Sequence, residues 1–264
     1  MGDFTLYGYC ITNDDETDCL QNALSSMARI PVDRFLLINS GTQKALIHHQ
    51  RLFQPLREWL ASRKEYNAER ETWNEMPLVV IDEPFTDPAH MRNFALRWIE
   101  QNAPANTWIV AIDSDEVEST EAERGMRELL AGLPDDVTNV VQPLANLVQD
   151  ERHIAGSYHS DWLCHARLHR VGTDKVWYVG SWHESEEYKG NRVKWNARII
   201  HQRMLYRRRL YLQRGHPFLR DAWGDLQMVD LPSDVSFSPL EWPKDEAEIP
   251  FLEDIRTYMG GKYA

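Results

Sequence analysis

The sequence predicts an α/β protein built on a mostly parallel central sheet that is flanked by helices. Three observations lead to this prediction. Short hydrophobic runs alternate with helical stretches through the first half of the 264 residues. These stretches are long enough for the right-handed crossovers that parallel strands require. A cluster of acids directly follows one of the runs, and in parallel sheets ligands bind at the carboxyl ends of the strands.

Four hydrophobic runs in the first half are expected to be strands. They are residues 4–11, 33–39, 77–85 and 107–113. The segments between and after them have apolar residues at helical spacing or a helix start signal. Before the fourth strand, Asp87 is the expected N-cap and Pro88 takes the first helical position. The expected helices lie at about residues 20–27, 48–74, 86–101 and 119–133.

The second half has a different pattern. Three apolar segments are expected to be strands, and they cover residues 137–148, 162–171 and 175–182. The turn residues 172–174 predict a hairpin between the last two, and the basic stretch 197–215 predicts a helix. We therefore expect one α/β domain over residues 1–215 and a mixed β and helical C-terminal extension over residues 216–264.

The composition is that of a globular protein without a membrane span. The chain has 41 acidic and 29 basic residues, a net charge of −12, which argues against a general nucleic-acid coat. No apolar run approaches the roughly 20 residues that cross a bilayer. The first residues lack the features of a secretory signal, and three scattered cysteines are too few for a disulfide framework. A cytoplasmic location is expected.

The segment "NTWIVAIDSDEVES" places four acids directly after a buried strand. They are Asp113, Asp115, Glu116 and Glu118. Burying a carboxylate is costly unless it is paired, protonated or bound to a metal. Asp113 and Asp115 would splay around one point at a turn, and two such carboxylates suit Mg²⁺ or Mn²⁺ together with phosphate oxygens. A solvated turn that caps the next helix is the alternative interpretation.

Four segments occur together in an order that is typical of one enzyme family. "AIDSDE" has the form of a DxD motif, and "HMRNFALRWIEQ" lies just upstream of it. "RLHRV" with "VWYVGSWHE" follows, and then "IIHQRMLYRRRLYLQ". The chain resembles the GT-A glycosyltransferases of family 2 in these segments, over roughly residues 3–215. The resemblance implies a Rossmann-like GT-A fold, with residues 1–118 as the nucleotide-binding half and 119–215 as the acceptor half.

The resemblance also implies a nucleotide-sugar donor, with a UDP-sugar favoured. Thr12 and Asn13 would line the base pocket, where the family more often has "RNE". Asn39 would contact uracil or ribose in place of the aspartate that the family usually has there. Arg92 and Asn93 would lie near the nucleotide, since a guanidinium can pair with phosphate through two hydrogen bonds.

Further roles follow for acidic and histidine side chains. The resemblance implies that Asp113 faces the ribose or sugar of the donor and that Asp115 binds Mn²⁺ or Mg²⁺. His183 and His201 are additional candidate metal ligands, through a ring nitrogen. Glu184 is the candidate general base that would deprotonate the acceptor hydroxyl in an inverting reaction.

The acceptor is less specified than the donor. Trp182, beside His183, is the aromatic residue expected to stack on a sugar ring. A glycan, a protein side chain and a modified nucleic acid are all chemically admissible acceptors. The arginines within residues 197–215 would allow a polyanionic one.

Two other functions are compatible with the sequence. "VAIDSDEV" also resembles the DxD strand of haloacid-dehalogenase phosphatases, in which Asp113 would be the nucleophile. That motif normally comes early in a chain, whereas here three strand and helix units precede it. The substitutions at Thr12, Asn13 and Asn39 also allow a non-catalytic protein that binds nucleotide sugars.

Overall fold

The strands expected in the first half are present. The computed structural model describes residues 4–13, 17–30, 32–40, 78–82, 85, 88–148, 150–155, 164–172, 174–179, 185–202, 205 and 228–240. The four N-terminal strands are β1 (Thr5–Asn13), β2 (Arg34–Ser40), β3 (Leu78–Asp82) and β4 (Thr107–Asp113). The helix predicted at residues 48–74 lies outside the described residues.

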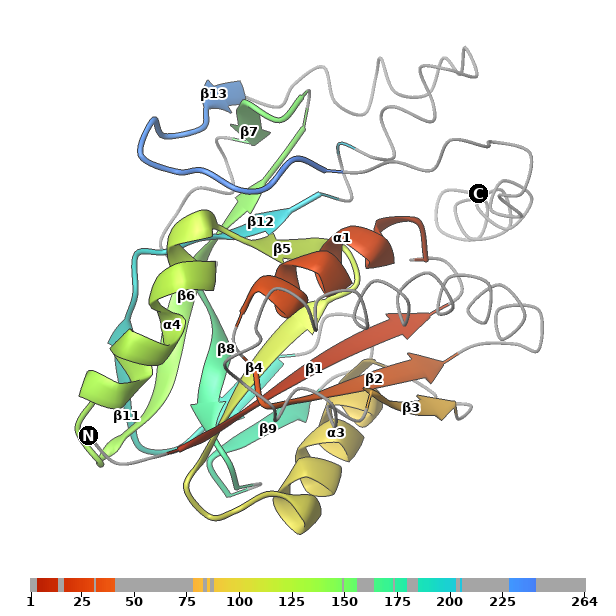
Figure 1. Ribbon diagram of the computed structural model, residues 1–264, viewed down its shortest axis with the longest axis vertical. Coiled ribbons are helices and arrows are strands. Elements are labelled where there is room, and N and C mark those ends of the chain that lie inside the picture. Colours follow the sequence, from red (N-terminus) through yellow and green to blue (C-terminus); the bar gives the residue numbers. More distant parts are fainter. Residues whose placement is uncertain are drawn as a thin grey trace, which may run out of the picture.

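These four strands are parallel neighbours in the order β3-β2-β1-β4 (Figure 1). The chain therefore moves outward from β1 to β3 and then returns to the other side of β1. This reversal makes the carboxyl ends of β1 and β4 a topological switch point, where open α/β sheets bind ligands. The mostly parallel, Rossmann-like sheet confirms the predicted fold class.

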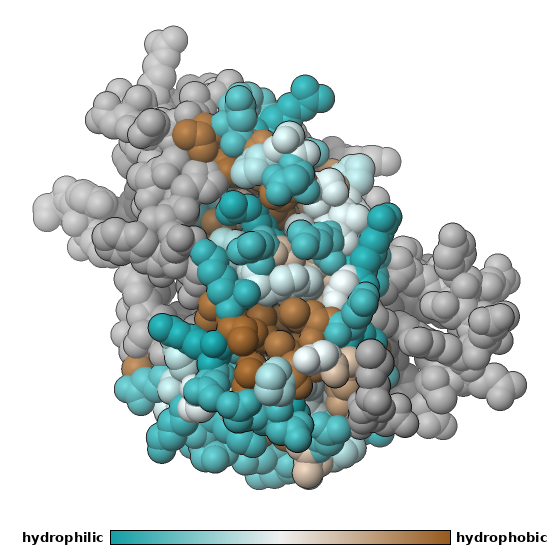
Figure 2. Space-filling model, turned by 90° about the vertical axis from the view of Figure 1, so that its left-hand side faces the viewer, coloured by the Kyte–Doolittle hydropathy of each residue, from teal (hydrophilic) through white to brown (hydrophobic). Residues whose placement is uncertain are grey.

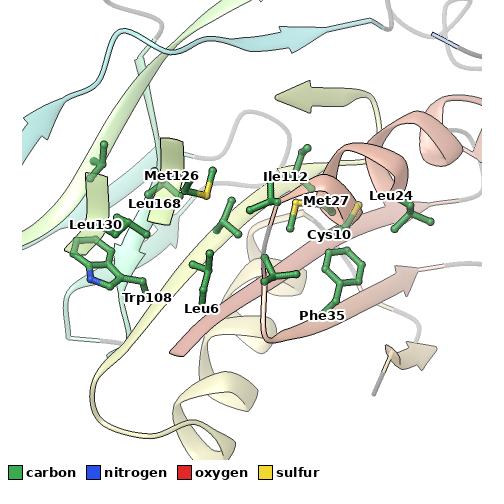
Figure 3. Packing of buried hydrophobic residues seen from close by; sticks show 14 of the residues in the cluster. Leu6, Cys10, Leu24, Met27, Phe35, Trp108, Ile112, Met126, Leu130 and Leu168 are labelled. Carbon is green, nitrogen blue, oxygen red and sulfur yellow. The ribbon is translucent and has the colours of Figure 1, made fainter. Parts of the chain in front are cut away.

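Alternate side chains of each strand point to opposite faces of the sheet. Because both sets are apolar here, helices cover both faces. Trp108, Val110 and Ile112 of β4 join a core with α1 (Thr17–Arg29) and α4 (Thr120–Gly132), which Figure 3 shows from close by. Ile109 and Ala111 join a second core, under α3 (Pro88–Asn102). The next residue on the α3 side is Asp113.

The main sheet continues with strands from the second half, and in the described part of the chain it has nine strands. β8 (Cys164–Arg170) lies between β4 and β6 (Val137–Asn146), antiparallel to both. β12 (Ile199–His201) pairs with β6 in parallel and with β5 (Glu116–Glu118) in antiparallel. β11 (Asn191–Lys194) pairs with another part of β6. The short strand β5 directly follows the acidic turn after β4.

Two predictions for this half are wrong. The strands on either side of residues 172–174 do not form a hairpin: β8 already has a partner on each side, and β9 (Val176–Val179) pairs with β10 (Ser185–Tyr188) in a separate sheet. The basic stretch 197–215 is not helical at its start, because Ile199–His201 form the strand β12. Pairing with β5 and β6 outweighs the local helical pattern there.

The described part of the C-terminal extension packs against the domain. β13 (Met228–Asp230) pairs with β7 (His153–Ala155), and the backbone N–H of Thr120 donates to the carbonyl of Ser236 at 2.7 Å. A third apolar core joins this segment to β5, β6 and β12, and it comprises Val117, Ala145, Leu147, Ile154, Ile200, Leu205 and Leu240.

One face of the molecule exposes part of the apolar core. Figure 2 shows apolar residues in the lower half of the face on which α4 and β11 lie, ringed by hydrophilic residues. Side chains packed at the margin of the first core include Leu129 of α4, Val193 of β11 and Trp195, all of them only partly buried. Within the described residues, no helix combines the length and the apolar character that crossing a bilayer requires.

Candidate functional site

The carboxyl ends of β1, β2 and β4 bring several predicted residues to one edge of the sheet. In the register of these strands, Ile11 is opposite Asp113 and Thr12 is opposite Asn39. Asn13 follows at the end of β1. The side chain of Thr12 is buried. The backbone therefore places the predicted donor residues Thr12, Asn13 and Asn39 beside the acidic turn.

Asp113 is held by two arginines from different elements. Arg92 of α3 donates through Nη2 to Oδ1 of Asp113 at 2.5 Å, and Arg167 of β8 donates through Nη2 to Oδ2 at 2.8 Å. The side chains of Arg92 and Arg167 are only 2% and 4% exposed, whereas that of Asp113 is 21% exposed. Two buried cations thus fix a carboxylate that still reaches solvent.

Glu116 closes the turn that carries Asp113. Its Oε2 accepts the backbone N–H of Asp113 at 3.0 Å, and its Oε1 accepts from Nη2 of Arg167 at 2.7 Å. Burial raises the pKa of Glu116, and the charge of Arg167 opposes this effect. Burial alone would lower the pKa of Arg167, but Asp113 and Glu116 outweigh it and raise that pKa. Glu116 and Arg167 therefore hold the turn in place through a hydrogen bond to its backbone and an ion pair.

Asp115 contacts His201, which lies 86 positions further along the chain. Nε2 of His201 lies 3.1 Å from Oδ2 of Asp115, with the two side chains 22% and 7% exposed. The antiparallel pairing of β12 with β5 produces this contact, because it sets His201 opposite Glu116. The next residue, Gln202, donates its backbone N–H to the carbonyl of Asp115 at 2.9 Å.

A buried polar seam connects this turn to α1. The side chain of Gln202 accepts from Nδ2 of Asn22 at 2.7 Å and donates to the carbonyl of Cys19 at 3.3 Å. One turn further along α1, Oγ of Ser26 accepts the N–H of Glu118 at 2.8 Å and donates to Glu123 at 2.9 Å. The first helix and the acidic turn are thus linked by side-chain hydrogen bonds.

Glu118 lies in this seam and is fully buried. Its Oε2 accepts from Nε2 of Gln142 at 2.9 Å. Burial raises the pKa of Glu118 to about 8, although the hydrogen bond from Gln142 opposes the shift. Oε1 of Glu118 and Oε1 of Gln142 both lack a donor among the described residues. A proton on the carboxyl group would supply one, so Glu118 is expected to be neutral at pH 7.

The side-chain amide of Asn93 forms two hydrogen bonds with the backbone of β9. Its Nδ2 donates to the carbonyl of Tyr178 at 2.8 Å, and its Oδ1 accepts the N–H of Tyr178 at 2.9 Å. The guanidinium of Arg92 lies over the ring of Tyr178, 5.2 Å from the centroid. The pair predicted to lie near the nucleotide is therefore buried, and its observed contacts are with protein groups.

The sequence predictions thus divide into three groups. Asp113 and Arg92 form one contact, and Asp115 and His201 form another. Thr12, Asn13 and Asn39 are placed by their strands at the same edge. The predicted residues Trp182, His183 and Glu184 lie outside the described residues. Whether any of these residues binds a donor, a metal or an acceptor stays a prediction.

Sequence reasoning missed Arg167 and Gln202. Arg167 belongs to "RLHRV", and a lone arginine in a strand gives no sign that it is buried. The signal that could have found it is strand alternation: Leu168 faces the first core, so Arg167 faces the opposite side of the sheet. Gln202 follows His201 directly, and its role depends on a strand that local periodicity does not predict.

The residues at the turn fit a divalent ion only in part. Asp115 and His201 bring a carboxylate oxygen and an imidazole nitrogen together, and both are common ligands of Mn²⁺. Among the described residues, no group of three or more histidine, cysteine, aspartate or glutamate side chains is arranged to hold a metal ion. An ion at this position would complete its coordination with phosphate oxygens and water, as Mg²⁺ usually does.

No protein-family model and no curated protein matches the sequence. Several solved structures match parts of the chain at low sequence identity. TarS of S. aureus is 11% identical with a TM-score of 0.45, over 84% of this chain and 40% of that one. A structure of TarS residues 1–349 in complex with UDP is 10% identical with a TM-score of 0.42, over 77% of this chain and 62% of that one.

A 4-diphosphocytidyl-2C-methyl-D-erythritol synthase is a further match, 11% identical with a TM-score of 0.37, over 66% of this chain and 78% of the other. The chain spans less than half the length of the full TarS chain that it matches.

Proposed function

We propose that the protein is a glycosyltransferase that moves a sugar from a nucleotide-sugar donor to an acceptor with the help of a divalent metal. The observation that carries the proposal is the pairing of Asp115 with His201 beside the fixed, partly exposed Asp113. These groups lie at the switch point of the sheet, where a nucleotide would approach the carboxyl ends of β1 and β4.

The donor side of the proposal uses the edge formed by β1, β2 and β4. Thr12, Asn13 and Asn39 would contact the base and the ribose of the donor, and a UDP-sugar is the favoured donor. Asp113 would accept hydrogen bonds from hydroxyl groups of the ribose or sugar. Its two arginine partners support this role, because they hold both carboxylate oxygens in place before the ligand arrives.

In the proposed metal site, Asp115 and His201 would hold Mn²⁺ or Mg²⁺, with His183 as a further candidate ligand. The ion would neutralise the charge that develops on the diphosphate leaving group. The backbone would orient the site: the N–H of Gln202 donates to the carbonyl of Asp115, and the β5–β12 pairing brings His201 to it.

On the acceptor side, Glu184 would deprotonate the attacking hydroxyl group and Trp182 would stack on a sugar ring. Direct attack on the anomeric carbon would invert its configuration. Glu184 immediately precedes β10, which pairs with β9, and Arg92 contacts both Asp113 and the ring of Tyr178 on β9. The assignment of Glu184 as the base rests on the resemblance of "VWYVGSWHE" to the family segment. The acceptor would be a glycan, a protein or a modified nucleic acid.

The contacts of Asp113 work against the phosphatase interpretation. A nucleophilic carboxylate needs a free oxygen directed at phosphorus, whereas each oxygen of Asp113 accepts a hydrogen bond from a buried guanidinium. Hydrogen bonds from cations also lower the nucleophilicity of a carboxylate. We therefore favour transfer from a nucleotide sugar.

A screen for donor turnover tests the proposal. The protein is incubated with UDP-, GDP- and TDP-sugars and Mn²⁺, and nucleotide release is followed by mass spectrometry. We expect release from one nucleotide class, dependent on Mn²⁺ and absent from Asp115→Asn. Failure to bind or cleave any nucleotide sugar would contradict the proposal, and so would hydrolysis of p-nitrophenyl phosphate through a phosphorylated Asp113.

A further inference from the structure

Two consecutive residues of α3 contact two different parts of the site. The guanidinium of Arg92 binds Asp113 at the end of β4, and the amide of Asn93 binds the backbone of Tyr178 in β9. The burial of both residues is nearly complete, and Asn93 is only 7% exposed. Burying polar groups is expensive unless their hydrogen bonds are made, and these contacts engage both ends of the Asn93 amide and Nη2 of Arg92.

The β9–β10 hairpin needs such a connection. Among the described strands, β9 and β10 pair only with each other, so no ladder of backbone hydrogen bonds joins them to the main sheet. The carbonyl of Lys189, just after β10, accepts from Oγ1 of Thr138 on β6 at 2.8 Å. Along β9, the amide of Asn93 takes the place of a neighbouring strand, since it binds both the N–H and the C=O of Tyr178.

Tyr178 joins the two contacts. Its ring lies under the guanidinium of Arg92, and its hydroxyl group receives a hydrogen bond from the hydroxyl of Tyr9 on β1 at 3.5 Å. A displacement of β9 would therefore disturb Arg92, which holds Asp113. The hairpin and the acidic turn are linked by α3 through these buried contacts.

We propose that Arg92 and Asn93 are a positioning pair that fixes the β9–β10 hairpin relative to Asp113, rather than ligands of the nucleotide. The role in transfer rests on the proposed function, but the mechanical link does not. Arg92 would act through Asp113, and Asn93 would act through Tyr178. The separation of the hairpin from the main sheet is what makes the pair necessary.

Hydrogen exchange and nucleotide binding together test this inference. Asn93→Ala removes both hydrogen bonds to Tyr178, and Asn102→Ala is a matched control on the same helix, where the exposed side-chain amide donates to the carbonyl of Trp98. We expect amide exchange in residues 176–179 and 185–188 to accelerate at least about tenfold in Asn93→Ala, from the loss of two buried hydrogen bonds. Exchange in β1 and β4 should change little, and Asn102→Ala should resemble the wild type.

Kinetics separate positioning from a general structural role. Once a donor has been identified, Asn93→Ala should lower kcat for sugar transfer about tenfold or more, while the donor KM and the affinity for UDP with Mn²⁺ stay within about twofold.

Two results would overturn the inference: unchanged exchange in the hairpin of Asn93→Ala, or equal acceleration throughout the protein. Unchanged hairpin exchange together with a loss of UDP affinity would make Asn93 a ligand of the nucleotide instead. If the wild type bound no nucleotide, the proposed function would fail, while exchange in the hairpin would still decide whether Asn93 fixes it.

Discussion

Nε2 of His201 lies 3.1 Å from Oδ2 of Asp115, although 86 positions separate the two residues in the chain. The contact arises because β12 lies between β5 and β6, which brings the histidine to the acidic turn. The backbone of Gln202 also binds the carbonyl of Asp115. Two segments that are far apart in the chain therefore meet at one carboxylate, which is the basis of the metal site that we propose.

His201→Ala is predicted to weaken Mn²⁺ binding more than Mg²⁺ binding. Imidazole nitrogen suits Mn²⁺ better than the harder Mg²⁺, so the variant should lose selectivity as well as affinity. Electron paramagnetic resonance of bound Mn²⁺, with Mg²⁺ as competitor, measures both. His153→Ala is a matched control, because His153 lies at the surface between Asp150 and Asp230. Equal losses for the two ions would remove His201 from the ligand set.

Arg167→Met is predicted to destabilise the fold by about 3–5 kcal/mol, because it leaves the buried Glu116 without its cation and Asp113 with Arg92 alone. Denaturant unfolding measures the change. The double variant Arg167→Met with Glu116→Gln should recover part of the loss, since one uncompensated carboxylate has been neutralised. Purely additive effects of the two substitutions would show that the pair is not coupled.

The free energy of unfolding should fall as the pH rises, because Glu118 titrates. Its pKa is raised from 4.5 to about 8 by burial, so between these values the folded state holds a proton that the unfolded state has released. Unfolding then releases a proton, and the free energy of unfolding decreases as pH rises, levelling off above about pH 8.

Glu118→Gln removes this titration while keeping the shape of the neutral side chain. The variant should match the wild type in unfolding free energy near pH 5 and exceed it near pH 8. Glu121→Gln, an exposed substitution on α4, serves as the control. Parallel curves of unfolding free energy against pH for wild type and Glu118→Gln would mean that Glu118 is ionised in the folded protein at neutral pH.

Local patterns were sufficient to predict the four N-terminal strands and the helices that are described beside them. Alternation along β4 assigns Ile109 and Ala111 to one face, and Asp113 continues that series, so it meets Arg92 on the helix covering that face. The acidic residues after a core strand also led to the candidate site at the end of β4. Both signals arise from residues close together in the chain.

The remaining features depend on pairing between distant segments. The segment containing His201 has helical periodicity, but β12 forms because β5 and β6 offer it backbone partners. β9 was expected to pair with β8, whose two edges are taken by β4 and β6. Arg167 and Gln202 look like surface residues in the sequence, and only the assembled sheet buries them against carboxylate and carbonyl groups.

Asp115→Asn should weaken Mn²⁺-dependent nucleotide binding with little loss of stability. Loss of a group that merely orients a ligand costs about 10- to 100-fold in metal affinity, so loss of a direct ligand should cost at least that much. Asp135→Asn, fully exposed at the surface, is the control for removing one negative charge. Urea unfolding of both variants checks that the fold is retained.

The most direct test is therefore calorimetric titration of UDP into the wild-type protein and Asp115→Asn, with and without Mn²⁺. The wild type should bind UDP tightly only when Mn²⁺ is present, and Asp115→Asn should lose that dependence together with most of the affinity. UDP binding that is equally strong without Mn²⁺, or that is unchanged in Asp115→Asn, would contradict a metal–diphosphate site at the end of β4.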